Sequence, residues 1–377
     1  MNFRSVKSLL VAAFGLFMVF FSNVSSAQDT THATEHAAGD HAQAEEGKFN
    51  VTQTILEHIK DDHSWHLWGH TSIALPVILY SDEGLETFCS SSLVDEHHHP
   101  VAYQGKNYSY KLVEGKIKVV NAEGAIDEAA SKKVWDFSIT KNVASLLITV
   151  VLLLLIFLSV ARAYKKQGVT SAPKGFQSFM EPIILFVRDD VAKPNIGHKY
   201  EKYMPFLLTV FFLIWINNIL GLVPFFPGGA NVSGNIAFTM TLAVVTFILV
   251  NINGNKSYWG HIFWMPGMPI AMKIFLAPIE LLGVFTKPIS LMIRLFANIT
   301  AGHILVLSLI CLIFIFKSVV ASAIAVPFAV FISMIELLVA FLQAFIFTML
   351  AAMYIGMAIE EHHHHGDHEP HYNETED

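Results

Sequence analysis

Five long apolar segments beyond residue 140 constrain the fold of this chain more than any other feature of its sequence. The first, residues 142–161, contains no charged side chain over 20 residues, which is enough for a helix to cross a bilayer. Within a bilayer a segment must satisfy its own backbone hydrogen bonds, so such segments fold as helices. Only 15% of all residues are charged, against about 25% in soluble domains. The sequence therefore predicts an all-α membrane protein.

The other four expected crossings are residues 203–223, 235–250, 271–316 and 322–359. At about 1.5 Å per residue, each of the last two helices would be about 55–70 Å long, against about 30 Å of hydrocarbon. They must therefore tilt strongly, kink at Pro288 or extend beyond the core. Residues 175–191 mix apolar and charged side chains, which is typical of an amphipathic helix lying at the interface.

The N-terminus has the features of an export signal. Arg4 and Lys7 precede a short apolar stretch, and small residues follow it before residue 28. An uncleaved anchor would fit the same residues. Positive charge directly follows the first expected span, at Arg162, Lys165 and Lys166, and such charge marks the cytoplasmic side. We predict a bacterial inner-membrane protein with a periplasmic N-terminus and a cytoplasmic C-terminus.

Composition divides the chain into five predicted parts. They are a signal peptide (1–27), a disordered segment rich in His and acidic residues (28–49), a periplasmic α+β extension (50–135), the membrane domain (136–361) and a His-rich cytoplasmic tail (362–377).

Within the extension we expect a helix over residues 50–68 and strands over residues 72–80, 101–111 and 116–120. Its clustered histidines could bind a metal: His58, His63, His66 and His70. No cysteine or acidic residue at ligand spacing completes a site, so a packing or solvated helix is the favoured alternative. The histidine tail could bind metal or buffer protons, or be a solvated end. We predict no metal site and no cofactor.

A stripe of charged side chains runs along one face of the expected helix over residues 271–316. Its four charged members are spaced seven apart: Lys273, Glu280, Lys287 and Arg294. Seven residues at about 100° each come within about 20° of two full turns, so these side chains share one face. Ser290 and Asn298 extend the same stripe. A polar line on an otherwise apolar helix must face protein or water rather than lipid.

Arg294 is the central anomaly of the stripe, because apolar residues surround it and continue to Phe316. An arginine in mid-membrane costs about 2.5–3.5 kcal/mol on insertion scales. Snorkelling to an interface would lower that cost and is the alternative. Arginine does not deprotonate, so it cannot relay protons. A fixed cation beside a mobile carboxyl group instead favours release of that group's proton.

The last helix supplies a complementary carboxyl group. Glu336 and Gln343 are seven residues apart and share a face. His303 is nine residues after Arg294, about 900°, and so points half a turn away from it. His303 can then face a neighbouring helix, where Glu336 is the natural partner. A His–Glu pair inside the membrane is a plausible proton relay, and a static ion pair that braces two helices is the alternative.

Three stretches resemble the signature of F-type ATP synthase subunit a. The first runs from Lys287 to Asn298, the second from Leu342 to Phe347, and the third from Asn218 to Pro224. The resemblance covers residues 175–361 and leaves out the N-terminal extension, whose role it does not explain.

The resemblance implies a role for each matching residue. Arg294 matches the family's essential arginine, which opposes the carboxylate of the c-ring. Asn298 and Gln343 match polar residues of the proton path, and His303 and Glu336 fall where family members have an acid and a histidine. Glu280 and Ser290 match polar positions lining the path, with Glu280 nearer the cytoplasm. The resemblance assigns no role to Lys273.

The predicted function is that of a proton-translocating stator subunit. By resemblance, two half-channels carry protons to and from the c-ring, Arg294 separates them, and the partners are the c-ring, the peripheral-stalk b subunits and the bilayer. The chain has no phosphate-binding loop, so we expect ATP chemistry on other subunits and no enzyme activity of its own. Its net charge of −7 does not suggest nucleic acid as a partner. The alternatives are a secondary ion or metal transporter and a membrane scaffold.

Overall fold

The computed structural model describes residues 51–360, except 53–54, 56–58, 69–70, 96–98, 114, 122–123, 169–171, 173–174, 224–225 and 266. The predicted signal peptide, the segment over residues 28–49 and the histidine tail lie outside the described residues, as do His58 and His70. Residues from Val51 onward belong to one compact unit.

The described part of the chain is mostly helical and contains five segments long and apolar enough to cross a membrane. The helices that account for them are α4 (Lys141–Gln167), α7 (Tyr200–Leu222), α8 (Ile236–Asn253), α10 (Ile270–Phe316) and α11 (Val319–Ile359). The predicted number of crossings and the all-α class are confirmed. The observed ends differ from the predicted ones by a few residues, mainly because polar first and last turns belong to the same helices.

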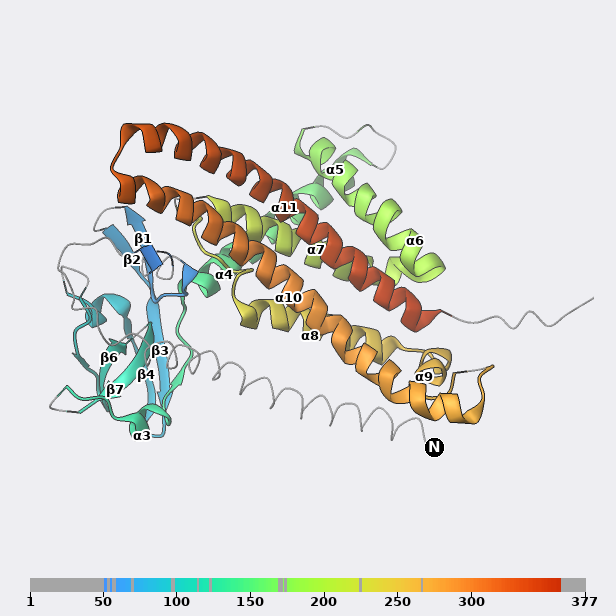
Figure 1. Ribbon diagram of the computed structural model, residues 1–377, viewed down its shortest axis with the longest axis horizontal. Coiled ribbons are helices and arrows are strands. Elements are labelled where there is room, and N and C mark those ends of the chain that lie inside the picture. Colours follow the sequence, from blue (N-terminus) through green and yellow to red (C-terminus); the bar gives the residue numbers. More distant parts are fainter. Residues whose placement is uncertain are drawn as a thin grey trace, which may run out of the picture. The chain divides into compact units, whose positions relative to one another are not determined.

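The two longest helices run side by side in Figure 1, where α10 is orange and α11 is red. They contain 47 and 41 residues, which is about 70 Å and 62 Å of helix. The turn between them is short, and Lys317 adopts a left-handed conformation there with φ of 44°. A hairpin of this length brings residues far apart in sequence onto one shared interface.

The segment predicted to lie at the interface begins with α5 (Phe176–Phe186). A π-helical turn, η3 (Val187–Ala192), then leads through α6 (Lys193–Ile196) and η4 (Gly197–Lys199) into α7. Of these elements, η3 and α6 pack on α11. Gly356 permits the contact, because a Cβ atom there would collide with the Asn195 carbonyl. Small side chains on α11 allow similarly close packing at Ala344, Ala351 and Ala352.

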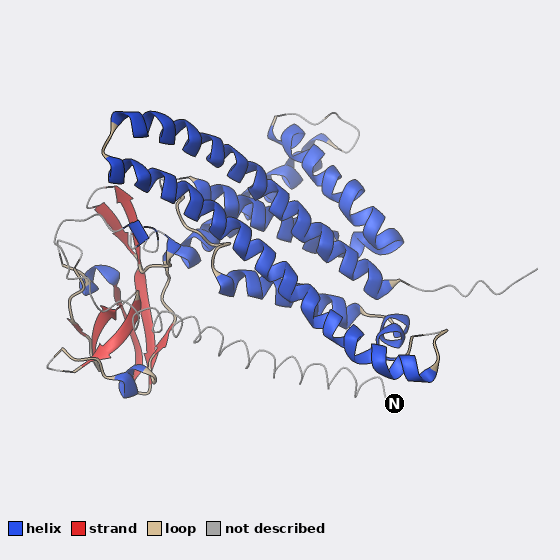
Figure 2. Ribbon diagram, viewed as in Figure 1, coloured by secondary structure: helices blue, strands red, loops and turns tan. Residues whose placement is uncertain are grey.

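The strands lie in the part of the chain before α4 (Figure 2). A two-stranded sheet pairs β1 (Ser64–Trp68) with β2 (Thr71–Ala74). A second sheet has the order β4 (Gly84–Cys89), β3 (Pro76–Ser81), β8 (Trp135–Asp136), and a third joins β5 (Tyr103–Gln104), β6 (Ser109–Val113) and β7 (Lys116–Val120). This part of the chain also contains two short helices, η2 (Ser90–Leu93) and α3 (Glu128–Ser131). The core that its strands and helices share includes Val77, Leu79, Leu93, Tyr110 and Val119.

The predicted helix over residues 50–68 is wrong in its second half. Residues 64–68 form β1, so His63 and His66 do not have helical spacing. The aromatic residues Trp65 and Trp68 favour a strand, and pairing with β2 satisfies the backbone. The Nε2 atom of His63 lies 3.1 Å from Asp136 Oδ2. Among the described residues no group of three potential metal ligands occurs.

Strand β4 was not predicted from the sequence, because the usual alternation of buried apolar and exposed polar side chains is inverted in it. Leu85 is exposed, whereas Glu86 is buried. The Glu86 carboxylate accepts a hydrogen bond from the Tyr110 hydroxyl at 2.5 Å, and it also accepts from the amides of Lys106 and Asn107. Burial, together with the bond to Glu86, raises the pKa of Tyr110 far above its usual value. A satisfied buried carboxylate thus replaces the apolar residue that a strand pattern would require.

Candidate functional site

A histidine and a glutamate meet between the two longest helices. The Nδ1 atom of His303 on α10 lies 3.6 Å from Oε1 of Glu336 on α11. The Glu336 side chain is only 5% exposed and that of His303 is 18% exposed. Gly302 makes room for this arrangement, because a Cβ atom there would lie 2.9 Å from Glu336 Oε1. The acid and the imidazole expected to face each other are therefore neighbours.

His303 also contacts the region around α7. A Cβ atom on Gly221 would lie 3.6 Å from His303 Nε2 and 3.2 Å from the Ala230 carbonyl oxygen. The imidazole therefore has Glu336 near Nδ1 and Gly221 of α7 near Nε2. An imidazole with two usable nitrogens can accept a proton at one and release it at the other.

One helical turn closer to Arg294, Asn298 donates a hydrogen bond from Nδ2 to Gln343 Oε1 at 2.8 Å. Gln343 is almost fully buried, whereas Asn298 is exposed at the surface of the chain. On α7, Asn218 donates to the Ala340 carbonyl at 3.3 Å. The family resemblance implies that Asn298 and Gln343 belong to one proton path, and in the structure the two side chains are hydrogen-bonded to each other.

Several buried polar atoms near this site have no hydrogen-bond partner among the described residues: Glu336 Oε1, Gln343 Nε2 and Asn218 Oδ1. A buried polar atom without a partner costs free energy, and proteins usually satisfy such atoms with ordered water. The interface between α7, α10 and α11 therefore contains buried polar atoms whose hydrogen bonds the described residues leave unsatisfied.

Arg294 is half-buried on α10, and it forms no ion pair within the part of the chain that the structure describes. Ser290, one turn away, is exposed. The Arg294 face of α10 therefore borders the outer surface of this chain, where another protein can approach it.

The rest of the charged stripe follows α10 away from Arg294. Lys287 lies over the Tyr354 ring at 5.6 Å, and Lys273 lies over the Trp264 ring at 4.7 Å. Glu280 between them is half-buried. Cation–π contact with an aromatic face offsets part of the cost of placing an ammonium group beside apolar helices. The stripe is thus partly covered by other elements of the same chain.

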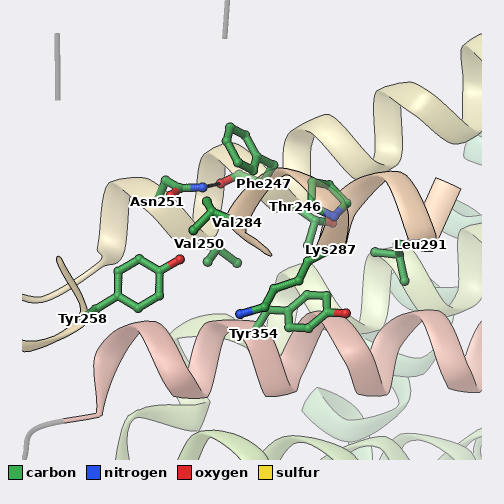
Figure 3. Close-up of a pocket in the computed structure, with 10 residues that line it drawn as sticks. Thr246, Phe247, Val250, Asn251, Tyr258, Val284, Lys287, Leu291 and Tyr354 are labelled. Carbon is green, nitrogen blue, oxygen red and sulfur yellow. Dashed lines mark hydrogen bonds between the residues drawn. The ribbon is translucent and has the colours of Figure 1, made fainter. Parts of the chain in front are cut away.

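Lys287 and Tyr354 also line a small cavity between α8, α10, α11 and α9 (Lys256–Phe263). Figure 3 shows the Lys287 side chain against the Tyr354 ring. The cavity measures about 20 Å³, which is room for one water molecule. Tyr258 lies on its wall, and burial together with the negative charge of Glu280 raises the pKa of Tyr258 to about 12. The side-chain oxygen of Asn251, Oδ1, is also buried and has no hydrogen-bond partner among the described residues.

Sequence reasoning overlooked Tyr354 as a site residue, although a signal for it was present. Tyr354 is eleven residues after Gln343, about 1100°, which is about 20° from three full turns. It therefore extends the stripe of Glu336 and Gln343 along α11. Tyr258 and Asn251 had no comparable signal, because they come from elements whose packing on α10 the sequence does not reveal.

These features define a class of protein: a multi-pass α-helical membrane protein with a buried acid–imidazole pair and a charged stripe at a helix interface. The family model described as ATP synthase A chain matches residues 143–356, more than half of the chain. The chain belongs to this family.

Similar proteins support the same assignment. A protein of Chlorobium phaeobacteroides (strain DSM 266) named ATP synthase subunit a is 50% identical over 241 residues, covering 62% of this chain and 69% of its own length. A protein of that name from Chloroherpeton thalassium is 47% identical, covering 62% and 70%. One from Myxococcus xanthus is 40% identical, covering 62% and 77%.

Membership of the family defines the coarse role of the chain. It is a multi-pass membrane subunit of the F-type ATP synthase, acts in the proton channel of that complex and is not catalytic by itself. A second family model, described as a domain of unknown function (DUF8433), matches residues 54–137. The part of the chain that contains the strands therefore has no role assigned by similarity.

Proposed function

We propose that this chain provides two half-channels that carry protons to and from a ring of c subunits, and that Arg294 separates them. The observation that carries the proposal is the state of Arg294. It is a permanent cation, half-buried on a membrane helix, without an ion-pair partner in the described part of its own chain. Such a charge is costly in a membrane unless a partner compensates it, so the acidic partner belongs to another subunit.

The outer half-channel is assigned to His303, Glu336, Asn298 and Gln343. The 3.6 Å separation of His303 and Glu336 and the 2.8 Å bond between Asn298 and Gln343 support this assignment. The buried polar atoms between α7, α10 and α11 support water as the link between the two pairs. Protons pass from His303 and Glu336 along this track to the c-ring carboxyl group.

The inner half-channel is assigned to Glu280 and Ser290, with the cavity at Lys287 and Tyr354 beside them. Glu280 lies two helical turns beyond Lys287 and offers a carboxylate that can accept the departing proton. Arg294 between the two half-channels favours deprotonation of the c-ring carboxyl group and blocks direct proton passage, because a guanidinium does not give up its own proton.

The exposed surface of the long hairpin suits a ring of apolar helices. Large exposed apolar side chains on α10 and α11 include Phe275, Ile293, Phe328, Phe331 and Met334. We place the c-ring against the Arg294 face of α10, and lipid and the peripheral-stalk b subunits elsewhere. The basic last turn of α4, with Lys165 and Lys166, supports a cytoplasmic location for that end of the helix and a periplasmic N-terminus.

Cysteine cross-linking tests where the c-ring lies. The background is Cys89→Ser, since Cys89 is exposed and Cys311 is buried. Ser290→Cys is expected to form a disulfide with a cysteine placed next to the c-subunit carboxyl group, and to bring an oligomeric ring through purification. Leu155→Cys on α4, which is exposed on a helix away from α10, is the matched control. Cross-linking from Leu155→Cys but not from Ser290→Cys would refute the proposal.

A further inference from the structure

The residues just before β1 bind the start of α4. Asp61 accepts a hydrogen bond from the Thr140 hydroxyl at 2.8 Å and another from the Asn142 amide at 3.0 Å. The Lys141 amide donates to the Asp62 carbonyl oxygen at 2.8 Å. Free amides at a helix start need acceptors, and a carboxylate there also interacts favourably with the helix dipole. The extension is therefore attached to the first membrane helix by more than its covalent link.

Trp65 of β1 binds a second element of the membrane domain. It is 3% exposed and packs with Ala230 and Val232, which are also buried. Its indole Nε1–H donates a hydrogen bond to the Gly228 carbonyl at 3.1 Å. Its ring meets Phe226 edge-on with a centroid distance of 5.2 Å. A buried tryptophan with a satisfied N–H is a typical anchor of an interface, here onto the loop of residues 226–235.

The same loop approaches His303 through Gly221 of α7. The Ala230 carbonyl oxygen and His303 Nε2 both lie against Gly221, at 3.2 Å and 3.6 Å from the position of a Cβ atom there. Ala230 of the loop, which packs with Trp65, and the His303 imidazole are therefore both neighbours of Gly221 on α7. A displacement of the loop at Trp65 is therefore expected to alter the surroundings of Gly221 and, through it, of His303.

The space around the loop is polar although it is buried. Four buried side chains near its contact with α4 have a polar atom without a partner among the described residues: Asn142, Ser145, Asn231 and Ser233. Lys141 is close enough for its charge to act on His303. Such atoms are usually satisfied by ordered water. Water between the extension and the imidazole would connect the site to the aqueous phase.

We propose that the domain formed by residues 51–137 is the outer cap of the proton uptake path, and that Trp65 is a positioning residue that holds the loop of residues 226–235 against His303. This inference rests on the proposed function, because it gives the extension a role at the outer half-channel. It assigns a task to the segment that matches only a domain of unknown function.

A labelling experiment tests whether Trp65 packs on the loop of residues 226–235. Val232 is 2% exposed beneath Trp65. In the intact complex with Cys89→Ser, Val232→Cys should resist a membrane-impermeant maleimide added from the outer side. Adding Trp65→Ala should make it reactive, whereas Trp135→Ala, which removes an exposed tryptophan of the same domain, should not. Rapid labelling of Val232→Cys with Trp65 in place would overturn the proposal.

A flux experiment tests the proposed role of Trp65 in proton uptake. In vesicles containing the complete synthase, Trp65→Ala should lower proton-driven ATP synthesis roughly tenfold, since small misplacements of reacting groups have effects of this order or larger. Trp65→Phe, which keeps a ring but loses the N–H, should lower it about two- to fivefold. The outer pH that gives half-maximal flux should also move in Trp65→Ala, since Glu336 lies 3.6 Å from His303 and the charge of Lys141 acts on the same imidazole. ATP hydrolysis by the soluble sector and recovery of the c-ring should be unchanged.

The outcomes separate this inference from the proposed function. Wild-type flux and an unchanged pH profile in both Trp65 variants would overturn the proposal that the domain caps the uptake path. This holds even if Glu336→Gln abolishes flux and the proposed half-channel stands. Normal flux in Glu336→Gln would overturn the proposed half-channel instead. If Trp65→Ala prevents assembly, Trp65→Phe decides: unchanged flux in that variant contradicts the positioning role.

Discussion

The Nδ1 atom of His303 lies 3.6 Å from Oε1 of Glu336, although the two residues belong to different helices and are 33 positions apart in the sequence. Both side chains are largely buried, and Glu336 Oε1 has no hydrogen-bond partner among the described residues. A brace between helices would be stronger with that oxygen fully satisfied. A partly satisfied pair is better suited to exchanging protons with water, which leads to the following expectations.

Replacing the carboxyl group of Glu336 should stop proton transfer without disturbing the fold. Glu336→Gln keeps the shape of the side chain but cannot carry a proton, so passive proton conductance should fall by about a hundredfold or more. The measurement is acidification of vesicles stripped of the soluble sector. Glu360→Gln at the exposed end of α11 is the control and should leave conductance unchanged. Equal conductance in both variants would reduce the His303–Glu336 pair to a brace.

Adding one methyl group beside Glu336 should have a similar but smaller effect. In Gly302→Ala, the new Cβ atom would meet Glu336 Oε1 at 2.9 Å. The glutamate side chain must then move away from its present position, and proton flux should fall while the complex still assembles. Gly283→Ala on the same helix has nothing within 4 Å of its Cβ position. Flux that is lost in the Gly283 variant and retained in the Gly302 variant would contradict this packing argument.

The release of protons should depend on Glu280. Glu280→Gln removes the carboxylate near the cavity at Lys287 and Tyr354, and ATP synthesis driven by a proton gradient should decrease about tenfold. The comparison is Glu201→Gln, an exposed glutamate at the start of α7, measured in the same vesicles. A normal rate in Glu280→Gln would remove this residue from the inner half-channel.

Acid should loosen the extension through Asp136. Burial opposes ionisation of this carboxyl group, but hydrogen bonds from His63 and Ser138 more than offset it and lower its pKa. A carboxyl group with a lowered folded-state pKa stabilises the fold above its unfolded pKa of about 3.9, and this contribution is lost as the pH falls through the folded value.

Asp136→Asn should therefore already show at pH 7 the faster hydrogen exchange of β3 and β8 that the parent chain shows only in strong acid. Asp82→Asn, a change at an exposed residue whose ion pair with Lys133 has an N–O distance of 3.8 Å, is the control. The readout is hydrogen exchange of the intact complex across a pH series. Identical exchange in the parent and the Asp136 variant at pH 7 would show that the bond to His63 contributes no stability.

Periodicity explains why the helices and part of the site could be predicted from the sequence. The seven-residue spacing from Lys273 to Arg294, and from Glu336 to Gln343, fixes which side chains share a helix face. The half-turn between Arg294 and His303 directed His303 towards a neighbouring helix, where the structure places Glu336. Long apolar runs left no alternative to helices in a bilayer.

Contacts that depend on packing could not be predicted in the same way. Glu86 inverts the pattern of β4, and its partner Tyr110 is 24 positions away. The π-helical turn at Val187–Ala192 has no local sequence signal that competes with an α-helix. The contact of Trp65 with Gly228 joins residues 163 positions apart. Each of these depends on long-range packing, which composition and spacing do not encode.

The roles assigned to single residues rest most heavily on Arg294. The most direct test is proton-driven ATP synthesis by the complete complex, reconstituted with Arg294→Ala and, as a control from the same stripe, with Lys273→Ala. The fixed cation is expected to be indispensable, so Arg294→Ala should abolish synthesis although the c-ring is recovered, whereas Lys273→Ala should retain it. Synthesis at the parent rate in the Arg294→Ala complex would contradict the account.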